Sequence, residues 1–177
     1  MIDPVNPPTI MTRRLVIRPH QPADLDDLAA MWADPEVTRH IGITRDRQDT
    51  WLTMARLRGF WSLIGYGFWV VRDRRTDSFI GEAGFADFQR GLVPDISGAP
   101  EAGWAFAKSA WNQGYGTEAV SAMHTWLDET RPATRSTCVI EPDNRWSVRL
   151  AEKLGYTRFA TTLHKGMELG LFQRTPP

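Results

Sequence analysis

The stretch that decides the fold reads Glu101-Ala102-Gly103-Trp104-Ala105-Phe106-Ala107 and continues, after a short connection, as Gln113-Gly114-Tyr115-Gly116-Thr117-Glu118-Ala119. The first part has the apolar character of a buried strand, and the second places two glycines just before a helical pattern. The first backbone N–H groups of a helix have no partner within it and lie at the positive end of its dipole. The stretch therefore predicts a strand, a loop and a helix, with an anion site at the helix start.

Two common phosphate-binding motifs do not fit this loop. Ala119 stands where the dinucleotide fingerprint Gly-x-Gly-x-x-Gly requires its third glycine, and the Gly-Lys-Ser/Thr ending of a P-loop is missing. The same letters also suit an ordinary loop whose following helix is capped by Thr117. The loop alone leaves both interpretations open.

The segments on either side follow an α/β pattern. Hydrophobic spacing predicts helices at residues 23–32, 44–62, 118–129 and 144–154. Apolar and β-branched runs predict strands at 14–18, 66–72, 79–88, 101–107, 136–141, 156–160 and 163–171. A turn at 74–77 joins two of these strands as an antiparallel hairpin, so we expect an α/β fold with a mixed sheet.

Length and composition bound the class of protein. The 177 residues favour one domain, which we place at residues 12–177 behind a Pro-rich flexible lead-in at 1–11. The 21 basic residues balance the 21 acidic ones, which argues against a general nucleic-acid binder. The single Cys and four scattered His residues indicate no metal site, and we expect Cys138 to be a small buried residue and His124 to lie on the surface. With neither a signal peptide nor a membrane span in the pattern, we expect a cytoplasmic protein.

A second motif lies near the C-terminus and reads Ile140-Glu141-Pro142-Asp143-Asn144-Arg145-Trp146-Ser147, followed by Lys153-Leu154-Gly155-Tyr156. Together with the first stretch, with Thr12 to Pro19 and with Ile80 to Gly84, it resembles the GNAT superfamily of acyl-CoA N-acyltransferases. The closer resemblance is to the RimJ/RimL-like branch, which acetylates protein N-termini. It runs from about Thr12 to Phe172, nearly the whole chain.

The resemblance implies a V-splayed, mostly antiparallel sheet with helices on both faces. Acetyl-CoA would lie between the strands at 101–107 and 136–141, and no metal would be needed. The implied cofactor-binding residues are Trp104, Ala105 and Phe106 along the pantetheine arm, Gln113, Gly114, Tyr115, Gly116 and Thr117 around the pyrophosphate, and Asn144 on the arm. One departure is Trp111, which stands where the superfamily prefers Arg or Gln.

The implied reaction is direct attack of a primary amine on the thioester in a ternary complex. Only a neutral amine attacks, so the enzyme needs a proton acceptor and later a donor for the thiolate. Glu101 is our first candidate for the base because its strand borders the expected thioester, and Glu82 is the second because it interrupts an apolar strand. Ser147 is the candidate acid. Each of the three also has an ordinary interpretation, as a salt-bridged strand residue or a polar helix residue.

The acceptor stays open between a protein N-terminus and a small amine such as an amino acid, a polyamine or an aminoglycoside. Residues 39–75 hold eight Arg against three Asp, which would attract an acidic acceptor or form a solvated helix face. Trp32, Trp51 and Trp61 would line an acceptor pocket or belong to the core. A non-catalytic acyl-CoA sensor is the alternative function, and a homodimer is an alternative to a monomer.

Overall fold

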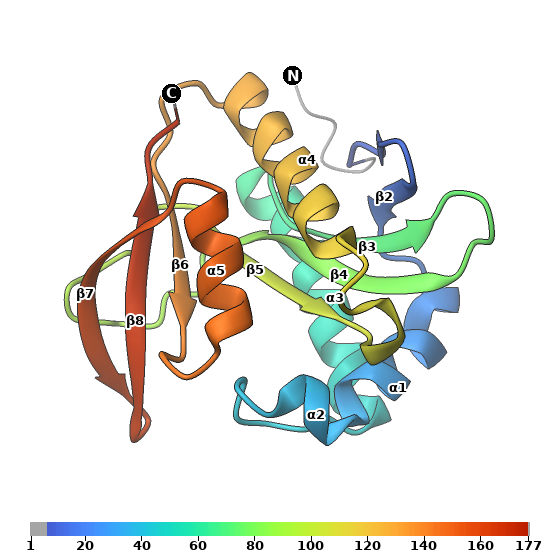
Figure 1. Ribbon diagram of the computed structural model, residues 1–177, viewed down its shortest axis with the longest axis horizontal. Coiled ribbons are helices and arrows are strands. Elements are labelled where there is room, and N and C mark those ends of the chain that lie inside the picture. Colours follow the sequence, from blue (N-terminus) through green and yellow to red (C-terminus); the bar gives the residue numbers. More distant parts are fainter. Residues whose placement is uncertain (1–6, 177) are drawn as a thin grey trace.

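The computed structural model describes residues 7–176 (Figure 1). The helices are α1 (Leu25–Ala33), α2 (Pro35–Thr38), α3 (Arg47–Ile64), α4 (Tyr115–Thr130) and α5 (Arg145–Lys153), with 3₁₀ turns η1 (Pro22–Asp24) and η2 (Lys108–Ala110). The strands are β1 (Ile10–Met11), β2 (Leu15–Pro19), β3 (Phe68–Asp73), β4 (Phe79–Ala86), β5 (Glu101–Phe106), β6 (Ser136–Ile140), β7 (Thr157–His164) and β8 (Met167–Arg174). The predicted helices and strands occur in the predicted order, while β1 and α2 are additional and the turn between the last two strands lies at 165–166 rather than at 161–162.

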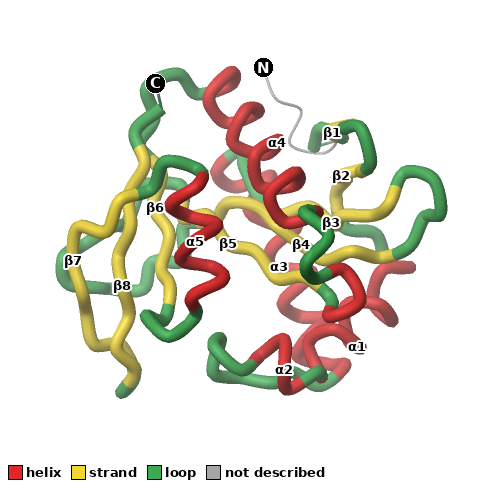
Figure 2. Tube along the Cα trace, viewed as in Figure 1, coloured by secondary structure: helices red, strands yellow, loops and turns green. Residues whose placement is uncertain are grey.

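All eight strands belong to one sheet, in the order β1-β2-β3-β4-β5-β6-β8-β7. Every neighbouring pair is antiparallel except β5 and β6, which run parallel. These two strands share only the pairs Glu101↔Thr137 and Ala102↔Cys138, whereas β5 pairs with β4 over its whole length. The sheet therefore opens into a V beyond Ala102, and Figure 2 shows β5 running away from β6. This confirms the splayed, mostly antiparallel sheet.

Helices cover both faces of the sheet, as predicted, with α4 and α5 in front of it and α3 behind it in Figure 1. Successive residues of a strand point to opposite faces of the sheet. Val71 therefore packs in the core cluster that contains residues of α4, and Val70 packs in the cluster that contains residues of α1. Trp61, Trp69 and Trp126 stack edge to face, with ring centroids 4.7–5.4 Å apart. Trp61 is thus a core residue.

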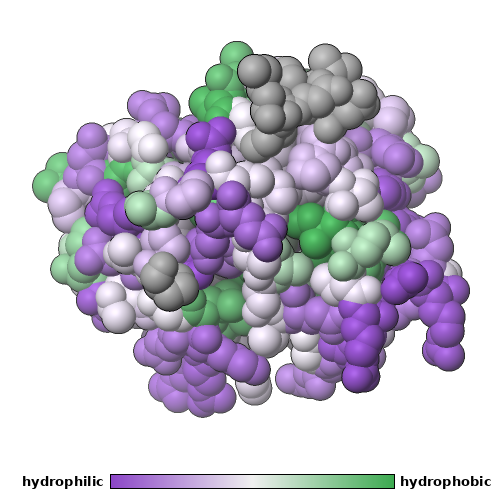
Figure 3. Space-filling view, turned by 90° about the horizontal axis from the view of Figure 1, so that it is seen from above, coloured by the Kyte–Doolittle hydropathy of each residue, from purple (hydrophilic) through white to green (hydrophobic). Residues whose placement is uncertain are grey.

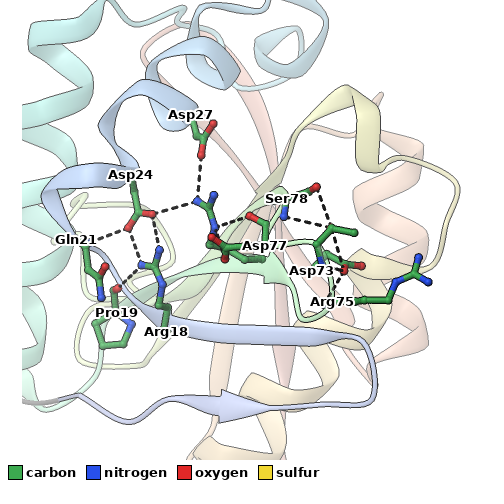
Figure 4. A network of polar contacts seen from close by, with 11 residues as sticks. Arg18, Pro19, Gln21, Asp24, Asp27, Asp73, Arg75, Asp77 and Ser78 are labelled. Carbon is green, nitrogen blue, oxygen red and sulfur yellow. Dashed lines mark hydrogen bonds and ion pairs between the residues drawn. The ribbon is translucent and has the colours of Figure 1, made fainter.

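An ion-pair network fixes the start of α1 against the sheet (Figure 4). Asp24 is buried and accepts hydrogen bonds from both Nη atoms of Arg18 at 2.7 Å, while Arg72 Nη1 lies 3.0 Å from Asp27. Burial alone would raise the pKa of Asp24, but the hydrogen bonds from Arg18 and from the Gln21 N–H keep that pKa below its ordinary value. This network sets the position of α1 and hence of Trp32, two turns further on.

The structure departs from the sequence-based expectations at several points. Ile10 and Met11 pair with β2 as a short strand within the expected lead-in, whose first six residues lie outside the described part. The second long helix begins at Arg47 rather than residue 44, because Asp46 caps it by accepting from the Asp49 N–H. Trp51 is exposed on this helix and belongs neither to the buried core nor to the lining of the cavity described below.

The visible surface in Figure 3 is mostly hydrophilic, with apolar side chains in small separate groups. Among residues 7–176, no helix combines the length and the apolar character that crossing a bilayer requires.

Candidate functional site

A cavity of about 680 Å³ lies where the sheet opens, and residues from both halves line it. One half contributes Glu82 of β4 and Glu101 to Phe106 of β5, and the other contributes Cys138 to Glu141 and Ser147 of α5. The cavity extends from the start of α4 on one side to Trp32 and Arg45 on the other. Residues of both the loop at 113–117 and the motif at 140–147 line this cavity.

The main chain of β5 has an unpaired edge toward this cavity. The Ala107 N–H donates to the Ile80 carbonyl on the β4 side at 2.9 Å, and the Thr137 N–H donates to the Pro100 carbonyl on the β6 side at 2.9 Å. Because successive residues of an extended strand present their main-chain groups to opposite edges, Trp104 and Phe106 face the opening and Ala105 faces β4.

The Phe106 carbonyl already accepts from Trp111 Nε1 at 2.8 Å. The N–H groups of Trp104 and Phe106 and the Trp104 carbonyl therefore remain for an extended ligand, whereas Ala105 offers only its side chain.

The start of α4 supplies the second element of the site. Gly114 is the N-cap residue, in the left-handed conformation with φ 76°, and the first helical hydrogen bond joins the Glu118 N–H to the Gly114 carbonyl. The N–H groups of Tyr115, Gly116 and Thr117 thus have no acceptor within the helix. Thr117 lies inside the helix, so the expectation that it caps the helix is wrong.

Contacts around this loop explain its two glycines and its rigidity. A Cβ on Gly116 would lie 3.0 Å from the Phe106 ring, so glycine allows the close packing of α4 on β5. Arg14 donates to the Gln113 carbonyl at 2.9 Å and to Glu118 at 2.7 Å, which ties the loop to β2. The Gln113 side chain donates to the Ser109 carbonyl and is absent from the cavity lining.

The two candidate bases lie on the same face of neighbouring strands, with different partners. Glu101 is buried and is held by Arg90, whose Nη2 lies 2.8 Å from one carboxylate oxygen. Glu82 is buried as well and accepts from Trp32 Nε1 at 2.8 Å, with His20 Nε2 at 2.8 Å from its other oxygen. Both side chains line the cavity.

Ser147 and Asn144 lie across the opening from β5. The Asn144 side chain caps α5 by accepting from the Ser147 N–H at 3.1 Å, which confirms its ordinary role and leaves its amide NH₂ to face the cavity. Trp104 Nε1 donates to Ser147 Oγ at 3.3 Å, so the serine hydroxyl keeps its own proton for another partner.

The side-chain pairings of several residues in this site could not be predicted from local sequence patterns. Arg45 and Trp32 are 13 positions apart, yet the Arg45 N–H donates to the Trp32 carbonyl at 3.0 Å and the guanidinium stacks on the indole, 3.7 Å from the ring centroid. His40 Nδ1 lies 2.8 Å from Glu141 at the cavity wall. These pairs form only through tertiary contacts.

Two further expectations concern residues beside the site. Cys138 is buried as expected, and burial raises the pKa of its thiol, which disfavours a nucleophilic role.

His124 is buried, not on the surface: its Nδ1–H donates to the Val120 carbonyl at 2.7 Å and its Nε2 accepts from the Tyr156 hydroxyl at 2.8 Å. Within residues 7–176, no three His, Cys, Asp or Glu side chains gather as a metal site would require.

Comparisons with known proteins agree with this geometry. An uncharacterized N-acetyltransferase, p20 of Bacillus licheniformis, is 28% identical over 153 residues, which cover 85% of this chain and 83% of p20. A putative GNAT-family acetyltransferase from Bordetella pertussis is 30% identical, with a TM-score of 0.84 over 94% of this chain and 99% of that one.

The fold is also that of RimL, a ribosomal L7/L12 α-N-protein acetyltransferase solved in complex with coenzyme A, with 13% identity and a TM-score of 0.75 over 95% of this chain and 98% of RimL. The model of the acetyltransferase (GNAT) domain matches residues 14–157. Since that match spans most of the sequence, including the split in the sheet and the loop before α4, the chain belongs to the GNAT acetyltransferase family.

Proposed function

We propose that this protein transfers the acetyl group of acetyl-CoA to a primary amine that attacks the thioester directly. The observation that carries the proposal is the open edge of β5, which lies in a cavity that begins at the unpaired N–H groups of α4. RimL has the same fold and is solved with coenzyme A, which supports acetyl-CoA as cosubstrate.

The start of α4 suits the pyrophosphate. Three N–H groups, from Tyr115, Gly116 and Thr117, point out of the helix at the positive end of its dipole. The pantetheine arm then extends along β5 and hydrogen-bonds the main chain of Trp104 and Phe106 as a further strand would. Asn144 contributes its amide from the opposite wall.

An arm that starts at α4 and follows β5 places the thioester toward Ala102, where the V closes. Glu101 adjoins that point and is our first candidate for the base that takes the amine proton. Glu82 pairs with Ala105, four residues along β5 and roughly 13 Å from Glu101 at about 3.3 Å per residue. Because this backbone spacing separates the two residues, we expect one of the two carboxylates to act as the base.

Ser147 is positioned to protonate the leaving thiolate. Because its Oγ accepts from Trp104 Nε1, its O–H remains free to donate toward the sulfur. Backbone N–H groups at the end of the V would stabilise the tetrahedral oxyanion.

Calorimetric titration with acetyl-CoA, followed by thiol release against a panel of primary amines and N-terminal peptides, tests the proposal. We expect binding of one acetyl-CoA per chain and thiol release that depends on the amine. Failure to bind acetyl-CoA would refute the proposal. Binding without turnover of any amine would instead establish the sensor alternative, which the two carboxylates in the cavity argue against.

A further inference from the structure

The charged side chains that line the cavity are unequally paired. Each carboxylate in the lining has a basic partner: Glu36 with Lys108, Glu82 with His20, Glu101 with Arg90 and Glu141 with His40. Arg45 and Arg56 also line the cavity, and among the described residues neither has a carboxylate within ion-pair distance.

Arg45 is held in place by Trp32, but it makes no ion pair among the described residues. Its guanidinium stacks on Trp32, and its Nη1 is buried with no hydrogen-bond partner in the described structure. A buried charged donor without an acceptor is costly unless a partner arrives. Burial lowers the pKa of Arg45, as the charge of Arg56 also does, while the charges of Glu82 and Asp49 act in the opposite direction.

Contacts along the sheet relate each guanidinium to one of the two candidate bases. Trp32, beneath Arg45, donates to Glu82, which pairs with Ala105 on β5. Arg56 precedes Leu57, which packs with Phe68 and with Ala86, the partner of Glu101. An anion between Arg45 and Arg56 thus lies over the stretch of sheet between the two candidate bases.

We infer that the acceptor is a primary amine carrying a carboxylate a few bonds from its nitrogen, which Arg45 and Arg56 bind together; this rests on the proposed acetyl transfer. A planar guanidinium binds a carboxylate with paired, charge-assisted hydrogen bonds. Free amino acids and peptides with an acidic residue at the N-terminus share this chemistry. A polyamine or an aminoglycoside has no carboxylate for the two arginines to bind, so we expect these acceptors to be turned over less efficiently.

The test compares acceptors that differ only in the anion. Thiol release is measured with an amino acid against its α-amide, and with a peptide beginning with Asp against one beginning with Asn. We expect kcat/KM to favour at least one carboxylate-bearing partner by about 10-fold or more, the size of effect that hydrogen bonds to charged groups produce. The pair that shows the preference identifies the source of the carboxylate.

Variants then assign the preference to the two arginines. Arg45→Met and Arg56→Gln should each remove most of it while leaving acetyl-CoA affinity unchanged, and Arg45→Lys should retain part of it. Arg56 is exposed, so its variant is informative even if Arg45→Met fails to fold. Arg39→Gln is the matched control, because Arg39 lies in the same basic stretch, is exposed and is absent from the cavity lining.

Equal turnover of both members of each pair would overturn the inference and leave acetyl transfer intact. A preference that survives in both Arg45→Met and Arg56→Gln would overturn it as well. If the wild-type protein bound no acetyl-CoA, this inference and the proposed function would fail together.

Discussion

Glu101 and Glu82 are two buried carboxylates on one face of the sheet, and they contact different side chains. Arg90, from an exposed loop, contacts Glu101, whereas Glu82 lies between His20 and the indole of Trp32. The side chain nearer the end of the V is the better candidate, because the thioester must lie within reach of the base.

Glu101→Gln should lower kcat by about 10²–10⁴-fold, the usual contribution of a positioned base, and leave acetyl-CoA affinity nearly unchanged. Steady-state thiol release and calorimetry measure the two quantities separately. Glu82→Gln is the matched comparison, since it removes the same charge four residues further along the paired strands. An unchanged kcat in Glu101→Gln with a large loss in Glu82→Gln would transfer the role to Glu82.

His124 should make stability depend on pH. Burial lowers the pKa of this residue to about 4 in the folded state, against about 6.5 when exposed, while the hydrogen bond to the Val120 carbonyl acts in the opposite direction. The unfolded chain therefore binds a proton first as the pH falls, and the free energy of unfolding should decrease between about pH 6.5 and pH 4, by about 3 kcal/mol in total. Urea unfolding across this range measures the slope.

The control for this dependence is His124→Gln, which cannot take up the proton. Its free energy of unfolding should vary less over the same pH range than that of the wild type. Identical slopes in the two proteins would show that other groups cause the dependence.

At the scale of helices and strands, the start of α4 is the element on which cosubstrate binding depends. Gly114→Glu should abolish acetyl-CoA binding, because it places a negative charge where the pyrophosphate would lie. Gly114→Gln is the matched control: it has nearly the same size and the same strain at φ 76°, but no charge. Calorimetry should show a much larger loss for Glu than for Gln, and equal losses would mean that strain alone is responsible.

The elements also show what the sequence can and cannot predict. The order of strands and helices, the loop before α4 and the N-cap at Asn144 follow from local patterns that the structure confirms. His124 was misplaced because a lone histidine at a helical position carries no sign of its burial against Phe85 and Tyr156. The stacking of Arg45 on Trp32 depends on how the α2–α3 connection folds back, which no local pattern records.

At the scale of the whole molecule, the cosubstrate should stabilise the fold by joining the two halves of the sheet. A ligand at 100 times its Kd adds about 2.7 kcal/mol to the stability of the folded state. For a chain of this length, that corresponds to a rise in Tm of roughly 5–10 °C. Differential scanning fluorimetry with and without acetyl-CoA measures the rise, and Gly114→Glu should show none. A Tm independent of acetyl-CoA in the wild type would contradict a site between the halves.

The unpaired edge of β5 has a further consequence for the enzyme between turnovers. A strand with free N–H and C=O groups is a template on which another extended segment can assemble. In most sheets such edges lie at the periphery, but here the main-chain groups of Trp104 and Phe106 are exposed in the interior of the sheet. A cosubstrate that pairs with β5 as proposed would act as a detachable strand that protects the enzyme against self-association, and purified enzyme stripped of coenzyme A should aggregate sooner than the loaded form.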